Sequence, residues 1–505
     1  MAVDKRSGNT LPIALGIALA GLLIHLLTNG RYGYFRDELY YLACGDHLDW
    51  GYVDHAPLIA LIARTSRSLF GDSLHAIRFF AALASPALIL LTGLIARELG
   101  GGRFAVALAC LCVLVAPIWL IMHTFLSMNA FEPLFWMGCA YVLLLVINCG
   151  NPKLLLWFGV LAGLGLENKH SMIFFGFALC AGLLLTKDRS LFLSPWLWIA
   201  AAFAALLFLP NVIWQYQHHW PTLEDLSNVR KTHKNVELSP VAFIGQQILI
   251  MLPTSALVWI PGLWFLLFHR AGKRYRALGY SFVVIFAVML ALNGKNYYLA
   301  PAYPMLFAAG AVFWERRPAW TKIALPALIL VTGALVAPLT LPVLPVDALI
   351  RWQEIIHVSP PKTEVAHEGA LPQHFGDMFG WPEMVATVAD VYHRLPAADQ
   401  PKTAILAGNY GEAGAIDFFG PRYGLPKAIS GHQTYYFWGP RNYTGEIMIL
   451  LQSDRADAEK YCTSVEPGPE LNQPYAMAEE HYQILICRGL KQPLRNFWPR
   501  IKHWN

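Results

Sequence analysis

Charge is the scarcest property of this 505-residue sequence. Asp, Glu, Lys and Arg make up 14% of the residues, hydrophobic residues make up 56%, and the mean hydropathy is +0.42. Soluble domains carry about a quarter charged residues, so the composition excludes an ordinary soluble protein. It predicts a polytopic α-helical membrane protein. The formal net charge is +5, but no basic run alternates with aromatic residues in a soluble segment, so we expect no nucleic acid partner.

Signatures of metal and nucleotide sites are also missing. Five of the eight cysteines lie in or beside apolar stretches without metal-ligand spacing, which favours core positions. No Gly-x-Gly-x-x-Gly follows a predicted strand, and Gly100-Gly101-Gly102 lacks the following Lys-Ser/Thr of a phosphate loop. The histidines between 215 and 240 have no metal-ligand spacing either. We therefore expect no nucleotide, no metal site and no required cofactor, with a divalent ion as the open alternative.

Apolar stretches account for most of the first 345 residues. The first of them follows Lys5 and Arg6, as in a secretory signal peptide, but it is long and has no small-x-small cleavage site. A retained first span is therefore favoured. Counted by length, the apolar runs predict about eleven transmembrane helices. Their predicted limits are 11–28, 76–96, 104–122, 131–149, 154–168, 171–186, 195–214, 241–268, 278–293, 299–314 and 323–345.

The distribution of Lys and Arg gives an independent prediction of orientation. With the N-terminus in the cytoplasm, every short connection on that side carries Lys or Arg, as the positive-inside rule requires. These connections are 97–103, 151–153, 187–189, 269–276 and 315–322. The opposite side then receives the first loop, 31–75, and everything after 346. Because most chemically reactive residues fall on this side, we expect an extracytoplasmic active face.

The tail from 346 to 505 has charges throughout and an ordinary globular composition. Short β-rich runs at 403–408, 446–452 and 482–488 alternate with helical patterns, which predicts a soluble α/β domain. We therefore expect a membrane domain over 1–345 and an extracytoplasmic domain over 346–505. Cys462 and Cys487 either pair in an oxidising compartment or remain two buried thiols.

The first external loop has the densest polar chemistry in the chain. Residues 31–57 contain five acids and two histidines between two apolar runs that have almost no charge. Membrane proteins concentrate such groups where water and substrates reach them. Asp37 and Glu38 form the predicted acid/base pair, and Asp54-His55 closes the loop two residues before Pro57.

These motifs resemble the dolichyl-phosphate-mannose protein mannosyltransferase superfamily. The shared features are Asp-Glu in a long first external loop, Asp-His before a proline, a lysine after the fifth span, and Lys-x-x-Tyr at 295–298 before a proline-rich span. The pattern is more closely similar to bacterial members of glycosyltransferase families 39 and 83, such as the lipid A aminoarabinose transferases. The tail segments 408–415, 430–432 and 436–440 also look like bacterial proteins of this group.

The resemblance implies a GT-C fold and the transfer of a sugar, with inversion, from a polyprenyl-phosphate donor to an extracytoplasmic acceptor. A lipid-linked donor agrees with the missing nucleotide site. The resemblance implies the bacterial inner membrane as location, with the tail in the periplasm, and lipid A, another envelope glycan or a protein as acceptor. The alternatives are a membrane transporter and a non-catalytic envelope-assembly protein. A transporter favours charges near the bilayer midplane and repeated halves, and the sequence has neither.

The family pattern also implies roles for the acids of the first loop. Asp37 is expected to be the general base that takes the proton of the acceptor hydroxyl, and Glu38 is expected to orient Asp37 or the acceptor. The alternative for Asp37 is a loop carboxylate that pairs with Arg36 or caps a short helix. Asp54 and His55 are expected to face the donor phosphate, with turn residues as the alternative. A neutral histidine would be a weaker cation there than a lysine.

Four residues outside the first loop complete the predicted site. Lys169, Lys295 and Tyr298 are expected to bind the phosphate and lipid of the donor, although such residues are also typical of membrane interfaces. Many relatives carry an aspartate before the fourth span, where this chain has Asn129. Glu132 is therefore a candidate catalytic residue, and stabilisation of a helix N-terminus is its alternative role.

Overall fold

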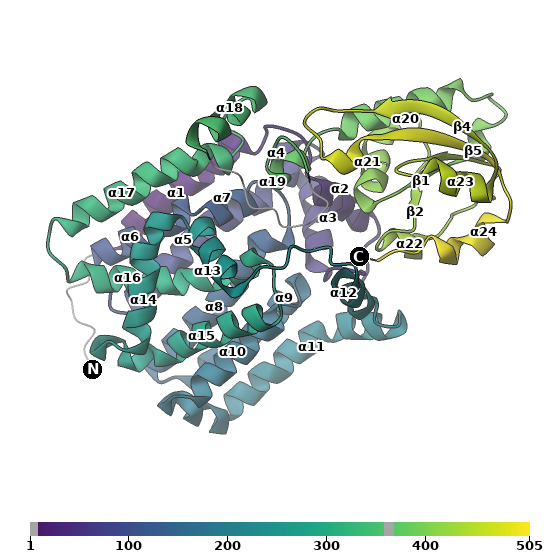
Figure 1. Cartoon of the computed structure of the whole chain (residues 1–505). Coiled ribbons are helices and arrows are strands. Elements are labelled where there is room, and N and C mark those ends of the chain that lie inside the picture. The colour runs from purple at the N-terminus through teal and green to yellow at the C-terminus, as the bar shows by residue number, and fades with distance from the viewer. Residues whose placement is uncertain (1–8, 358–367, 505) are drawn as a thin grey trace. The chain divides into compact units, whose positions relative to one another are not determined.

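The computed structural model describes residues 9–357 and 368–504 (Figure 1). The chain forms two compact units, which we call the helical unit and the sheet unit. The helical unit contains Met1–Arg31, Leu69–Ile213 and Glu237–Ile356. The sheet unit contains Tyr32–Ser68, Trp214–Val236 and His357–Asn505. The tail is therefore grouped with two earlier segments, one of which is most of the first loop. The boundary predicted after residue 345 did not include them.

The helical unit consists mainly of apolar α-helices. In chain order they are α1 (Leu11–Thr28), α4 (Leu74–Ile77), α5 (Phe79–Glu98), α6 (Arg103–Val115), α7 (Pro117–Met122), α8 (Met128–Cys149), α9 (Leu155–Asn168), α10 (Met172–Leu184), α11 (Pro195–Gln217), α13 (Pro240–Ile250), α14 (Ala256–Leu267), α15 (Arg276–Ala291), α16 (Tyr303–Glu315), α17 (Thr321–Val336) and α18 (Val346–Ile356). Short 3-10 helices connect several of them: η1 (Pro152–Leu154), η2 (Lys187–Leu193), η3 (Pro253–Ser255), η4 (Arg270–Tyr275), η5 (Asn296–Ala302) and η6 (Ala337–Leu339).

Each span predicted from the sequence coincides with one of these helices or with a pair of them. Among the described residues, six stretches are long and apolar enough to cross a membrane on their own, and a bent pair adds a seventh candidate. They are Leu11–Thr28, Phe79–Glu98, Met128–Cys149, Pro195–Gln217, Arg270–Ala291 and Thr321–Leu339. The polytopic helical fold is confirmed. The figure of about eleven crossings stays a prediction, because several of the remaining helices are shorter.

The predicted continuous run at 241–268 is wrong in one respect, because the helix breaks inside it. The axis bends by 98° between Pro240–Ile250 and Pro253–Leu267. Leu252 has a φ of 72°, and Pro253 follows it without a backbone N–H to donate. A left-handed residue before a proline ends an α-helix whatever the hydropathy of the run.

Close packing in the helical unit depends on small residues. α14 packs against α16, and each contributes a glycine to the contact. A Cβ atom at Gly310 would collide with the carbonyl oxygen of Val258, and one at Gly262 would collide with that of Leu306. Helices in lipid have little hydrophobic drive to associate, so close backbone approach at small residues is their usual means of packing.

We expect Gly310→Ala to destabilise the protein, because the added methyl group meets backbone that cannot rotate away. The expected loss is about 1–3 kcal/mol, typical of overpacking. The measurement is thermal unfolding in detergent. Gly176→Ala in α10 is the matched control, since its added Cβ meets no atom within 4 Å. It should leave the melting temperature unchanged or slightly higher. Equal melting temperatures for the two variants would contradict the packing argument.

The sheet unit combines short helices with one five-stranded sheet. Its helices are α2 (Arg36–Asp46), α3 (Leu58–Phe70), α12 (Pro221–Lys231), α19 (Gln373–Gly376), α20 (Trp381–Arg394), α21 (Tyr410–Phe419), α22 (Tyr435–Trp438), α23 (Arg455–Tyr461) and α24 (Leu494–Phe497), with η7 (Gln400–Lys402), η8 (Gly420–Tyr423), η9 (Ala478–Glu480) and η10 (Trp498–Arg500). Its strands are β1 (Thr403–Ala407), β2 (Ile429–Ser430), β3 (Ile447–Leu450), β4 (Cys462–Leu471) and β5 (Tyr482–Leu490).

The strands are ordered β2-β1-β3-β5-β4. β1 pairs in parallel with β2 and β3, whereas β5 is antiparallel to β3 and β4. β1 and β3 are apolar and almost wholly buried, as expected for strands covered on both faces. The three β-rich runs found in the sequence become β1, β3 and β5, so the predicted α/β character of the tail is confirmed.

A disulfide joins two neighbouring strands at one edge of the sheet. Cys462 at the start of β4 is bonded to Cys487 in β5, across a sequence separation of 25. Both side chains are buried in the core beside the sheet. Of the two alternatives that the sequence left open for these cysteines, the structure has the disulfide.

Candidate functional site

Asp37 lies in the first turn of α2, within the sheet unit. The helix begins after Phe35, whose N–H donates to the Glu38 carboxylate at 2.8 Å. Asp37 is half-buried, and its Oδ1 accepts a hydrogen bond from the Tyr410 hydroxyl at 2.8 Å. An acid in the first turn of a helix also interacts favourably with the helix dipole. The hydrogen bond fixes one oxygen of Asp37 and leaves the other without a role in it.

The neighbours of Asp37 have partners of their own. Glu38 is fully buried, and its bond to the helix start gives it a structural position. Its predicted role in orienting the base stays a prediction. Arg36 pairs with Glu479 at 2.5 Å, and its guanidinium carbon lies 5.5 Å from the ring centroid of Tyr410.

Asp54 lies near enough to Asp37 for the two carboxyl groups to interact electrostatically. Its Oδ1 accepts a hydrogen bond from the Tyr40 hydroxyl at 2.8 Å. Burial raises the pKa of Asp54 to about 7; the bond from Tyr40 opposes this rise, and the nearby charge of Asp37 adds to it. Asp54 therefore titrates near neutral pH, where a carboxyl group can either hold or accept a proton.

His55 lies inside an aromatic enclosure. Its side chain is 1% exposed and its ring stacks on Tyr52 with 4.5 Å between centroids. Its Nδ1 lies 2.9 Å from the carbonyl oxygen of Ala56, to which it donates. Burial lowers the pKa of His55 to about 4, so the ring is neutral at pH 7. The predicted contact of His55 with the donor phosphate stays a prediction.

We expect Asp54 to make the protein less stable as the pH rises from about 4 to 7. Its pKa is raised in the folded state, so the folded chain holds the proton more tightly than the unfolded chain, whose aspartates titrate near 3.9. The stabilisation is complete below that value and is lost as the pH rises through the folded-state pKa. Asp54→Asn stays neutral and still accepts from Tyr40.

This predicts that Asp54→Asn has a higher melting temperature than the parent at pH 8 and a similar one at pH 4. Thermal unfolding in detergent across this range measures the difference. Asp49→Asn, at an exposed loop position, should follow the parent at every pH. Parallel curves for Asp54→Asn and the parent would contradict the burial of the carboxyl group.

A second polar group lies in the helical unit around Lys169. The Lys169 ammonium donates to Asn129 Oδ1 at 2.7 Å and to Glu132 Oε2 at 2.9 Å. It also lies 4.5 Å from the ring centroid of Tyr298. The Ser171 hydroxyl donates to the other oxygen of Glu132. Glu132 is only 4% exposed, so its charge is buried together with that of the lysine.

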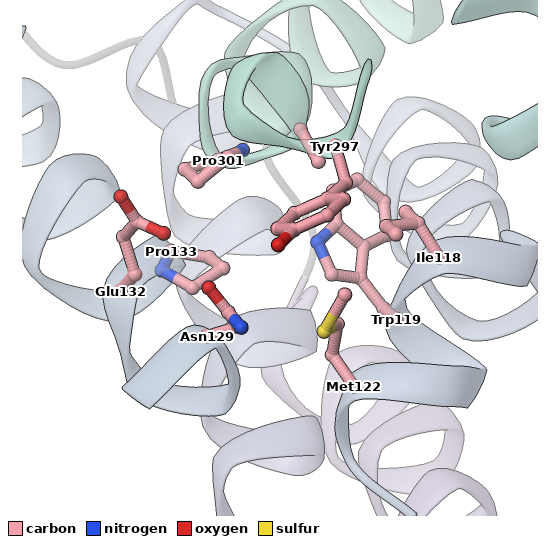
Figure 2. Close-up of a pocket in the computed structure, with 9 residues that line it drawn as sticks. Ile118, Trp119, Met122, Asn129, Glu132, Pro133, Tyr297 and Pro301 are labelled. Atoms are coloured by element: carbon pink, nitrogen blue, oxygen red, sulfur yellow. The ribbon is translucent and has the colours of Figure 1, made fainter. Parts of the chain in front are cut away.

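A pocket borders this second group (Figure 2). Asn129, Glu132 and Pro133 project into its wall from α8, and Tyr297 and Pro301 come from η5. The remaining lining is apolar and comes from α7 and η5: Ile118, Trp119, Met122 and Ala300. The pocket therefore has a polar side next to a buried cation and an apolar side.

The structure brings together many of the residues singled out from the sequence, but as two separate groups. Asp37, Glu38, Asp54 and His55 belong to the sheet unit, whereas Glu132, Lys169 and Tyr298 meet in the helical unit. Lys295 precedes η5 as its N-cap residue and is half-buried. Among the described residues, no group of three or more His, Cys, Asp or Glu side chains has the arrangement of a metal site.

Sequence reasoning missed the tyrosines that hold the two loop aspartates. Tyr40 was passed over as one aromatic among several in the loop, and Tyr410 lies in a tail segment noted only for its family resemblance. A tyrosine has no spacing or charge signal of its own. Tyr40 is marked only by the folding of the first loop onto itself, and Tyr410 only by the approach of the tail to that loop.

Comparison with known proteins finds a family match over part of the chain and a shared fold over almost all of it. Residues 54–214 match the dolichyl-phosphate-mannose-protein mannosyltransferase family. The resemblance inferred from the sequence is confirmed. ArnT from Cupriavidus metallidurans, the lipid A aminoarabinose transferase, has the same fold: its apo structure superposes with a TM-score of 0.61 at 15% identity, covering 94% of this chain and 97% of that one. The chain has the GT-C fold of ArnT.

Two further structures extend the comparison. ArnT bound to undecaprenyl phosphate matches equally well, with a TM-score of 0.61 at 14% identity and the same coverage of 94% and 97%. The oligosaccharyltransferase of Archaeoglobus fulgidus, tethered to an acceptor peptide with the NVT sequon, matches with a TM-score of 0.50 at 14% identity, over 82% of this chain and 64% of that one. No protein of curated function matches the sequence.

Proposed function

We propose that this protein is a membrane glycosyltransferase that moves a sugar from a polyprenyl-phosphate donor to an extracytoplasmic lipid or protein acceptor. One observation carries the proposal: almost the whole chain has the fold of ArnT, which has been solved with undecaprenyl phosphate bound. The family match over 54–214 supports it independently, because it rests on sequence alone.

Asp37 supplies the general base in this proposal. Transfer with inversion is an in-line displacement at the anomeric carbon: the acceptor oxygen attacks, its proton passes to a carboxylate, and the bond to the phosphate oxygen breaks. The base must be ionised and held in one orientation. The Tyr410 hydroxyl and the position of Asp37 in the first turn of α2 support this role, because the hydrogen bond holds the carboxyl group in one orientation. Asp54 is proposed as a second carboxyl group of the same loop. His55 is proposed to stabilise the loop, because its ring is buried and stacks on Tyr52.

Lys169 binds the donor phosphate in this proposal. The departing phosphate gains negative charge in the transition state, and a cation held nearby in a desolvated pocket stabilises it. Glu132 accepts a hydrogen bond from the Lys169 ammonium, so its proposed role is to position Lys169 rather than to act as base. Lys295 and Tyr298 are proposed to hold the donor beside them. The apolar side of the pocket suits the first isoprene units.

The proposed location is the bacterial inner membrane, with the N-terminus in the cytoplasm and the sheet unit in the periplasm. The bias of Lys and Arg toward alternate connections supports this orientation. The Cys462–Cys487 disulfide supports it too, because disulfides persist in oxidising compartments and are rare in the cytoplasm.

We expect Asp37→Asn to abolish sugar transfer while the protein stays folded and still binds polyprenyl phosphate. The amide still accepts the bond from Tyr410 but cannot take a proton, and loss of a general base typically lowers the rate about 10²–10⁴-fold. Single-turnover transfer is measured with an undecaprenyl-phosphate-linked sugar. Binding of undecaprenyl phosphate and the melting temperature are measured in parallel.

Asp46→Asn is the matched control, because Asp46 ends the same helix and forms exposed ion pairs with Arg64 and Arg67. Loss of such pairs costs about 1 kcal/mol or less and should leave transfer intact. Transfer by Asp37→Asn within about threefold of the parent would remove Asp37 as the base.

We expect the ammonium of Lys169 to account for much of the affinity for the donor phosphate. Removing Lys169 alone would leave Glu132 as an unpaired buried charge, which is strongly destabilising. The informative variant is therefore the double change Lys169→Gln/Glu132→Gln, which removes both charges together. It should fold, and it should bind undecaprenyl phosphate about 10- to 100-fold more weakly, the usual worth of a charge-assisted contact.

Glu132→Gln alone is the control for the lysine itself: the ammonium loses its charged partner, which should lower the melting temperature, but it keeps Asn129 and an amide oxygen as acceptors. Its affinity for undecaprenyl phosphate should be close to that of the parent or higher. Parent-like binding by the double variant would show that Lys169 has no role in holding the phosphate.

A further inference from the structure

The first turns of α2 and α21 are held together by direct backbone packing. Both helices belong to the sheet unit and pack on each other. A Cβ atom at Gly411 would collide with the side chain of Arg36, and one at Gly414 would lie 2.7 Å from the backbone of Leu39. Because the contact at Gly414 is with the Leu39 backbone, which cannot rotate away, the start of α21 has a defined position beside Asp37.

The start of α21 is itself firmly capped. The Asn409 side chain accepts hydrogen bonds from the N–H groups of Gly411 and Glu412 at 2.8 and 3.0 Å. In return, the Glu412 carboxylate accepts from the N–H of Gly408 at 2.7 Å. The next N–H, that of Tyr410, donates to His432 Nδ1 at 3.1 Å. These bonds satisfy N–H groups that a helix start leaves without partners, so the backbone at Tyr410 is immobilised.

The Tyr410 ring is held as tightly as its backbone. It stacks on Tyr40 with 4.7 Å between centroids and on His432 with 4.9 Å. The guanidinium of Arg36 lies 5.5 Å from the same ring. With these neighbours the ring has little freedom to rotate, and its hydroxyl points at Asp37 Oδ1. Tyr40, the partner in the stack, makes the equivalent bond to Asp54.

We infer that Tyr410, supplied by the C-terminal part of the chain, is a positioning residue for Asp37. This inference rests on the proposed function, in which Asp37 is the base. The phenol O–H keeps the carboxylate in one rotamer and stabilises its ionised form, so that the second oxygen takes the proton of the acceptor. The sheet unit thereby contributes to turnover as well as to the soluble fold, and donor binding does not depend on this contact.

The test is Tyr410→Phe in the full-length protein, which removes the hydroxyl and keeps the stacked ring. Release of undecaprenyl phosphate from an undecaprenyl-phosphate-linked sugar is followed with an envelope extract that contains both lipids and proteins as acceptors. We expect kcat to fall about tenfold, with the donor KM within twofold of the parent. The acid limb of the kcat–pH profile should move up by about one pH unit, because a carboxylate that loses a donor is harder to ionise.

Tyr435→Phe is the matched control. The Tyr435 hydroxyl donates to Asp417 Oδ2 at 3.2 Å, so this variant also loses a buried tyrosine–aspartate bond in the sheet unit. It should lower the melting temperature about as much as Tyr410→Phe, and it should keep the kcat and the pH profile of the parent. A role of Tyr410 in folding alone predicts that the two variants behave alike.

A second measurement avoids any cost in folding. Replacing Tyr410 with 3-fluorotyrosine keeps the ring and the hydroxyl but makes the phenol a stronger donor. The acid limb should then move to lower pH, opposite to the effect of Tyr410→Phe. An unchanged profile in both variants overturns the inference, provided that the parent transfers sugar. Absence of transfer by the parent would overturn the proposed function itself, so the two failures are distinguishable.

Discussion

The contact between α2 and α21 is the constraint on which the first group of candidate site residues depends. The Tyr410–Asp37 hydrogen bond joins residues 373 positions apart. It needs a glycine at 414, where a side chain would meet the backbone of Leu39. It also needs a capped helix start at Asn409, because uncapped N–H groups beside a carboxylate would compete for its oxygens. Close packing, capping and aromatic stacking thus act together, and the acidic group in the first loop depends on all three.

The second group of site residues, around Lys169 and Glu132, depends on the compensation of two opposite charges inside an apolar unit. Lys169 and Glu132 are costly in such surroundings unless each satisfies the other. The hydrogen bonds from Ser171 and to Asn129 complete that compensation. The result is a partly buried cation beside a pocket whose opposite side is apolar. Such a site suits a ligand with a phosphate at one end and a hydrocarbon chain at the other, which is the chemistry of the proposed donor.

Sequence reasoning located most of the architecture because apolar runs and their breaks are local properties. All eleven predicted spans correspond to helices or helix pairs, and the strands of the tail lie where alternating β-rich runs occur. It was least accurate where the backbone of one or two residues ends a helix although the surrounding sequence is apolar, as Leu252 and Pro253 do within the run 241–268. For His55, the phosphate contact stays a prediction, and the fold adds that the side chain is buried among aromatic rings. A sequence motif does not show whether its side chains are buried, because burial depends on segments that are distant in the sequence.

The sequence by itself determined that the chain is a polytopic helical membrane protein with an α/β tail, that acids concentrate in the first loop, and that a lysine follows the fifth span. Composition and periodicity carry this information because they act within a few residues of one another. Tertiary structure alone decided which partners these groups acquire: Tyr410 for Asp37, Tyr40 for Asp54, Glu132 for Lys169, and one disulfide from two candidate thiols. Hydrogen bonds and ion pairs depend on distances of about 3 Å, and only the folded chain brings residues so distant in sequence that close.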